Sequence, residues 1–135
     1  MKGIAFNFVL VGALAVTIGM GWGLHMAATH DHTFSGAHAH LNLVGFVTMT
    51  IYGFYYHMVP AAAAKGLAKI HFVVALVGVA IMIPGIAMAI KADMAMGAGE
   101  EVSGLSTALA PIGSIIVFVG MLIFVATILS NKLRD

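Results

Sequence analysis

Histidine is the residue type in this sequence best suited to chemistry, and the segment GAHAHLNLVGF holds two of the seven, His38 and His40. Imidazole is the commonest metal ligand in proteins and can also be buried in its neutral form. Ionisable residues within apolar membrane segments are rare and usually functional. The chain has no cysteine, which excludes disulfides, thiolate metal sites and haem attachment through Cys-x-x-Cys-His. Any metal would therefore be held by His, Met or oxygen ligands.

His38 and His40 are expected on different faces of one helix, because two residues of spacing correspond to about 200° of rotation. The face of His38 is small and polar, as in close contacts between membrane helices, and it carries Asn42, Gly45, Met49, Tyr52 and Tyr56. The face of His40 is apolar, with Val44, Val47, Ile51 and Phe54. An imidazole is not expected to face lipid, so an apolar cofactor with a flat macrocycle is its better companion. We take His40, His38, Asn42 and Gly45 as candidate cofactor-binding residues.

Two alternative functions need no macrocycle. The first is a copper or other metal-ion site on the loop that carries His25, His30 and His32, where nearby methionines would suit Cu(I). The second is an assembly partner without a cofactor, in which His38 and His40 form hydrogen bonds between helices. The residues leave the roles of His57 and His71 open.

The elements that must position these histidines are helices in a membrane. The chain is 61% hydrophobic and only 8% charged, far from the quarter charged that is usual in soluble domains. Four apolar segments, at about 4–24, 37–59, 67–90 and 105–129, each reach the roughly 20 residues that cross a bilayer. None alternates with a period of two, so we predict an all-α membrane protein of one domain, 1–135. Its four transmembrane helices would form an antiparallel up-down bundle.

The first segment is expected to remain as a helix, although Lys2 and the apolar run after it also fit a signal peptide. It is long for that purpose, and its glycines provide a face for helix packing: Gly12, Gly19, Gly21 and Gly23. With a net charge of +1 and no basic run, nothing in the chain favours nucleic acid as a partner.

The distribution of basic residues predicts the orientation. Most lie near the N-terminus, in the second connection or near the C-terminus: Lys2, Lys65, Lys69, Lys132 and Arg134. The positive-inside rule then places both termini in the cytoplasm of a bacterial-type inner membrane. The connections around Asp31 and Glu100 would face outward, with His38 and His40 near the outer side.

One part of the chain resembles a known family. The stretch AHAHLNLVGFVTMTIYGFYYHMVP, with KIHFVVALVG after it, is similar to the catalytic subunit of the haem–copper oxidase superfamily, especially its nitric-oxide-reductase and C-family cytochrome oxidase branches. The residues that match are His40, Asn42, Tyr55, Tyr56, Val59, Pro60, His71 and Phe72. His57 interrupts the Tyr-Tyr-x-Val-Pro pattern by one residue. The first and fourth segments match only as hydrophobic spans.

The resemblance implies a fold and a cofactor. The family subunit has three arcs of four helices, and the second helix of each arc supplies histidine ligands to haem or copper. This chain has the length of one arc, which implies a homotrimer with His40, or His38, as ligand of haem b. Electron transfer or binding of a small gas such as O2 or NO would follow, with an unknown redox partner. The family's copper site needs a His-His pair at the outer end of the third helix, where this chain has Met88, Ala89 and Ile90. That difference argues against oxygen reduction and leaves enzymatic activity open.

Overall fold

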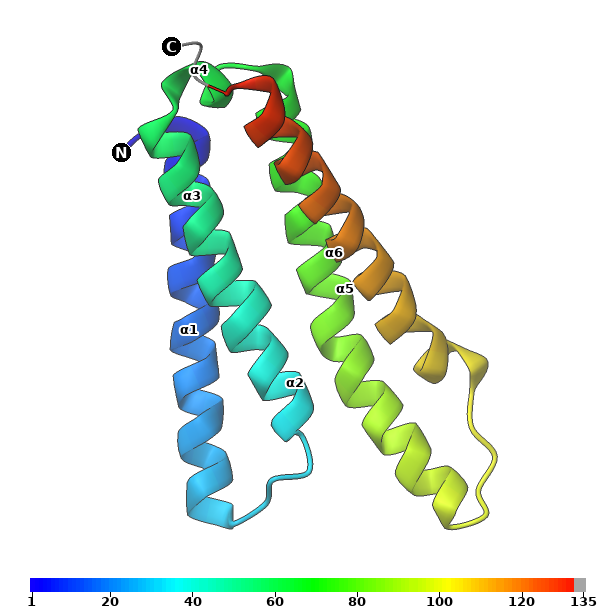
Figure 1. Cartoon of the computed structure of the whole chain (residues 1–135). Coiled ribbons are helices and arrows are strands. Elements are labelled where there is room, and N and C mark those ends of the chain that lie inside the picture. The colour runs from blue at the N-terminus through cyan, green and yellow to red at the C-terminus, as the bar shows by residue number, and fades with distance from the viewer. Residues whose placement is uncertain (133–135) are drawn as a thin grey trace.

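The structure is a computed structural model that describes residues 1–132, and within that range it is all-helical, with no strand (Figure 1). Arg134, one of the basic residues from which the orientation is predicted, lies outside the described residues. The elements in chain order are α1 (Gly3–Thr29), α2 (Ser35–His40), η1 (Leu41–Thr48), α3 (Met49–Met58), α4 (Pro60–Ala63), α5 (Gly66–Gly97) and α6 (Gly104–Ser130).

Three helices, α1, α5 and α6, are long and apolar enough to cross a membrane. They correspond to the first, third and fourth apolar segments, so the all-α prediction is confirmed and the membrane prediction is supported. The second apolar segment forms α2, η1 and α3, which follow one another without a break over residues 35–58.

Two helices are longer than predicted. Helix α1 continues to Thr29 rather than ending near residue 24, and α5 continues to Gly97 rather than ending near residue 90. The sequence KADMAM after residue 90 was expected in a connection, but it holds no Gly or Pro and is rich in the helix formers Ala, Met and Lys. Helix α5 stops where glycine becomes frequent, and Gly99 adopts a left-handed conformation with φ +81°.

The segment η1 is a π-helix, which the sequence did not predict. In such a helix the hydrogen bonds join residues five apart rather than four. The Thr48 hydroxyl shows the same five-residue spacing, since it donates to the carbonyl of Leu43 at 2.9 Å. In α1, by contrast, the Thr17 hydroxyl donates to Ala13, four residues earlier, at 2.8 Å. Short π-helical stretches are frequent at functional sites, and this one begins directly after His40.

The helices pack as two pairs, α1 with η1 and α3, and α5 with α6 (Figure 1). Glycines allow the close approach in both pairs. A Cβ atom on Gly53 of α3 would lie 3.0 Å from the Ala5 carbonyl oxygen, and one on Gly85 of α5 would lie 2.6 Å from the Ala110 backbone nitrogen. Of the glycines predicted to form the packing face of α1, Gly21 is an exception, since nothing lies within 4 Å of its missing side chain.

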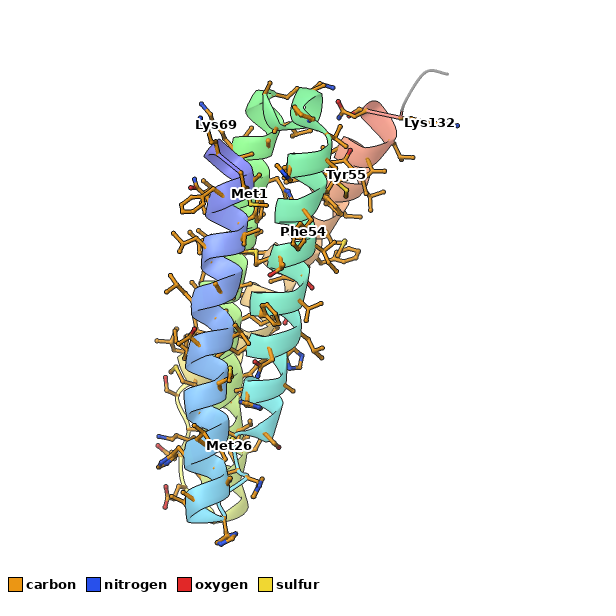
Figure 2. All side chains as sticks on the ribbon, turned by 90° about the vertical axis from the view of Figure 1, so that its left-hand side faces the viewer. Met1, Met26, Phe54, Tyr55, Lys69 and Lys132 are labelled. Carbon is orange, nitrogen blue, oxygen red and sulfur yellow. The ribbon has the colours of Figure 1, made fainter. Side chains whose placement is uncertain are left out.

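The two ends of the molecule differ in charge. At the end that holds α4, which we call the α4 end, lie Met1, Lys69 and Lys132, with Met26 toward the other end (Figure 2). Lys65 also lies there and donates from Nζ to Asn131 Oδ1 at 2.6 Å. The opposite end, with the connections around Asp31 and Glu100, is called the Asp31 end. Lys91, near the C-terminal end of α5, is the one lysine of residues 1–132 at the Asp31 end.

Candidate functional site at the start of the second apolar segment

His40 is the last residue of α2, and its ring is held in one tautomer by the backbone. Its Nδ1 lies 2.8 Å from the carbonyl oxygen of Gly36, one turn earlier. Because a carbonyl only accepts hydrogen bonds, Nδ1 carries the proton and, in the neutral ring, Nε2 carries a free lone pair. An Nδ1–H bonded to a backbone carbonyl is the arrangement by which metal-bound histidines are oriented.

The surroundings of His40 are apolar and open. His40 is exposed, and so are three side chains beyond it on the outside of η1 and α3: Leu43 is 62% exposed, Val47 40% and Ile51 54%. Of the predicted apolar face, Val47, Ile51 and Phe54 are exposed on this side, but Val44 instead packs against the core and Leu43 takes the outer position after His40. Among the described residues, His40 is exposed rather than enclosed. In a single copy, Nε2 of the exposed His40 ring faces the surroundings of the protein rather than its interior.

His38 lies on the other side of α2 and turns toward α1. Its ring is half-buried, edge-on to Trp22 with ring centroids 6.2 Å apart. The Asn42 amide nitrogen lies 3.3 Å from Nε2 and 3.5 Å from Nδ1. A donor nearly equidistant from both ring nitrogens lies along the hydrogen-bonding direction of neither. His38 therefore occupies the contact between α1 and α2 without a well-directed bond to either ring nitrogen.

The other two candidate residues serve helix packing in this chain. Asn42 donates from Nδ2 to the His38 carbonyl at 2.9 Å and packs against Gly19. Gly45 is buried, and a Cβ atom there would lie 3.1 Å from the Cβ of Ala15 and 3.6 Å from Val79 Cγ1. Gly45 thus lets η1 approach both α1 and α5.

The histidines of the copper alternative all lie exposed near the Asp31 end: His25, His30 and His32. Within residues 1–132 no group of three His, Asp or Glu side chains is arranged to hold a metal ion. The Asp31 carboxylate instead accepts from the Thr33 backbone N–H at 2.9 Å. Hydrogen bonding by Thr33 lowers the pKa of Asp31 below its ordinary value.

The structure reveals a fourth histidine environment, which the sequence left open. His71 of α5 is fully buried, and its Nδ1 lies 3.0 Å from the Tyr56 hydroxyl of α3. Its other nitrogen, Nε2, is buried with no hydrogen-bond partner in the described part of the chain. His57, by contrast, is exposed.

Aromatic rings from three helices enclose His71. The centroid distances to its ring are 4.4 Å for Tyr52 of α3, 5.0 Å for Phe8 of α1 and 5.5 Å for Phe124 of α6. Together with α5 itself, all four long helical segments meet at this residue. We call this group, with Tyr56, the His71 cluster.

A sequence pattern does point to the buried position of His71. Small or apolar residues share its face of α5 at helical spacing, and all are buried: Ala68, Ala75, Gly78 and Met82. His71 thus belongs to the packing face of that helix rather than to its polar end. Its partner Tyr56 lies on the predicted packing stripe of the second segment, but the sequence does not show that the two meet.

Comparison of this chain with protein-family models, with curated proteins and with solved structures found no match.

Proposed function

We propose that the protein is an integral membrane protein of four spans that binds haem b through His40. The observation that carries the proposal is the hydrogen bond from His40 Nδ1 to Gly36, which leaves an oriented, accessible Nε2 lone pair. Haem needs one or two axial ligands and an apolar surface around the macrocycle. His40 supplies one ligand, and the exposed apolar residues beyond it on η1 and α3 supply part of that surface.

His40 is a better candidate than His38 for the axial ligand. The His38 ring lies in the contact between α1 and α2, with Gly23 close to its Cε1 atom. His38 and Asn42 also line an open groove of about 440 Å³ beside α1, but the His38 ring has no backbone carbonyl that orients it as Gly36 orients His40. The resemblance to the haem–copper oxidase subunit also aligns His40, rather than His38, with the ligand position.

The remaining wall of the haem site would come from other copies of the chain. His40 is exposed rather than enclosed in the described part of one chain, so we propose a homo-oligomer, with a trimer as the state that the resemblance implies. Residues 35–58 would be the fourth span, and the lysine-rich α4 end would face the cytoplasm of a bacterial-type inner membrane. A bound haem would supply one-electron transfer or the binding of a small gas.

An absorption spectrum of the purified protein tests the proposal. The protein is expressed with haem supplied and is purified in mild detergent, and spectra are recorded with and without dithionite. We expect a Soret band in the wild type and its loss in His40→Ala. His57→Ala is the matched control, because His57 is also an exposed histidine of the same continuous helical segment. His38→Ala is expected to retain the band.

The outcomes separate the three functions. A colourless wild-type preparation would refute the haem site. A colourless protein that carries copper in stoichiometric amount, lost in a variant without His25, His30 and His32, would favour the metal-ion alternative. A colourless, metal-free protein whose His40→Ala variant fails to oligomerise would favour the assembly partner.

A further inference from the structure

A cavity of about 250 Å³ lies between the two helix pairs at the Asp31 end. Its lining comes from α1, from the connection before α2 and from one face of α5: Trp22, Phe34, Pro84, Ala87, Met88 and Lys91. Apart from the Lys91 ammonium and the Trp22 indole N–H, these side chains offer no polar group. The cavity is therefore apolar, with one positive charge at its edge.

Lys91 is unusual in two respects. Its ammonium lies 5.7 Å from the centroid of the Phe34 ring, within cation–π range. The described residues hold no ion pair to Lys91 within 4 Å, although Asp93 and Glu101 lie on nearby parts of the chain. Residues 1–132 hold five lysines, and Lys91 lies at the Asp31 end while the other four lie at the α4 end. This placement goes against the usual distribution of basic residues around membrane helices. An unpaired cation above an apolar cavity matches a ligand that is apolar in its body and anionic at its head.

The size and place of the cavity fit part of a lipid better than a whole small molecule. Pockets for drug-sized ligands measure about 300–1,000 Å³, so this cavity would take one chain segment and leave the rest outside. Trp22 belongs to the residue type that prefers the headgroup level of a bilayer. The cavity also lies near the ends of the predicted spans 4–24 and 67–90, close to the predicted membrane surface.

We propose that this cavity is a binding site for an anionic phospholipid of the leaflet at the Asp31 end. One acyl chain lies between Trp22 and the Pro84–Met88 face of α5, and the headgroup phosphate lies at Lys91. The proposal rests on the membrane embedding proposed above but is independent of haem. A lipid in this position fills the space between the two helix pairs.

The single tryptophan of the chain allows a direct test, because Trp22 lines the cavity. The whole protein is reconstituted in bilayers that contain phosphatidylglycerol and phosphatidylcholine in equal amounts, with brominated acyl chains on one or the other. Bromine quenches tryptophan fluorescence on contact. We expect brominated phosphatidylglycerol to quench Trp22 at lower mole fraction than brominated phosphatidylcholine, by about five-fold, which corresponds to the roughly 1 kcal/mol that one lysine contributes near a bilayer surface.

Three variants test whether Lys91 causes this preference. Lys91→Gln is expected to remove the preference for phosphatidylglycerol, and Lys91→Arg is expected to keep it. Lys69→Gln is the matched control, because Lys69 is an exposed lysine at the other end of the same helix and should leave the preference unchanged. Equal quenching by both lipids in the wild type, or an unchanged preference in Lys91→Gln, would overturn the proposal.

The haem content of each sample is measured from its absorption spectrum in the same experiment. The lipid site predicts the same haem content in Lys91→Gln as in the wild type, whatever that content is. A loss of haem in Lys91→Gln would assign Lys91 to the haem site and contradict the lipid site. A colourless protein that still prefers phosphatidylglycerol would refute the haem proposal and support this one.

Discussion

The pair formed by Tyr56 and His71 predicts a measurable coupling between two buried residues. In the structure the Tyr56 hydroxyl and His71 Nδ1 satisfy each other at 3.0 Å, while His71 Nε2 remains unpaired. Removing the Tyr56 hydroxyl leaves both ring nitrogens of His71 without a hydrogen bond, whereas removing both groups leaves neither member of the pair unsatisfied. The variants are Tyr56→Phe, His71→Leu and the double variant.

The expected energies follow from these partners. A hydrogen bond between membrane helices contributes about 0.6 kcal/mol on average and about 1.7 at most. A buried polar group left unsatisfied costs about 1–3 kcal/mol. Tyr56→Phe is therefore expected to lower the free energy of unfolding by about 1–3 kcal/mol, since it leaves both nitrogens of His71 unpaired. His71→Leu removes the unpaired Nε2 and leaves the Tyr56 hydroxyl near the Thr127 side chain, so its effect should be smaller.

The double variant is decisive. It removes every unsatisfied polar group of the pair, so we expect it to be at least about 1 kcal/mol more stable than the sum of the single effects predicts. Unfolding by SDS is followed in mixed micelles through the fluorescence of Trp22, which lies at the other end of the molecule. If the two single effects add to within about 0.5 kcal/mol, the interaction described for the His71 cluster is wrong.

Three further predictions concern other parts of the chain. Gly85→Ala should destabilise the protein by about 1–3 kcal/mol, because its new Cβ meets the backbone of α6, while Gly21→Ala, which meets nothing, should stabilise it by up to about 1 kcal/mol; thermal unfolding in detergent compares the two. Because the chain has no cysteine, the single variants Thr33→Cys and Ala64→Cys can each be labelled in intact cells with an impermeant maleimide. Only Thr33→Cys should react. Reaction of Ala64→Cys alone would reverse the proposed orientation. Thr33 lowers the pKa of Asp31, so the contribution of this turn to stability is present above the pKa of an unfolded aspartate and is lost as the pH falls through the lowered value. In an NMR titration, Thr33→Val should move the titration midpoint of Asp31 upward. An unchanged midpoint would contradict the assigned cause.

Much of the fold could be predicted because membrane helices are strongly constrained. Lipid leaves the backbone no partner but itself, so each long apolar segment must be helical. The helix ends were predicted less well, because Leu24 and Ile90 end the apolar runs but not the helices. Helix formation continues through the Ala- and Met-rich sequence that follows, until a residue adopts the left-handed conformation: His30 after α1 and Gly99 after α5. The π-helix could not be predicted, since the choice between hydrogen bonds four and five residues apart depends on packing against α1 and α5.

The candidate site could be predicted only in part. The spacing of His38 and His40 correctly indicated that the two side chains face different directions, because that depends on helix geometry alone. It did not reveal that His38 packs against α1, or that Gly36 orients His40. The sequence also did not identify the His71 cluster, because its five rings come from four helical segments and meet only through tertiary packing.

The arrangement in two pairs has a consequence for how the protein is made. Contacts within each pair join segments that are neighbours in the chain, so each pair can assemble while it leaves the ribosome, the N-terminal one first. The His71 cluster needs Phe8 from the first pair and Phe124 from the second, so it forms only when both are complete. The imidazole of His71 would then be shielded only in the last step of biogenesis. Two fragments divided between Ala64 and Lys65 and expressed separately should each insert into the membrane and still associate.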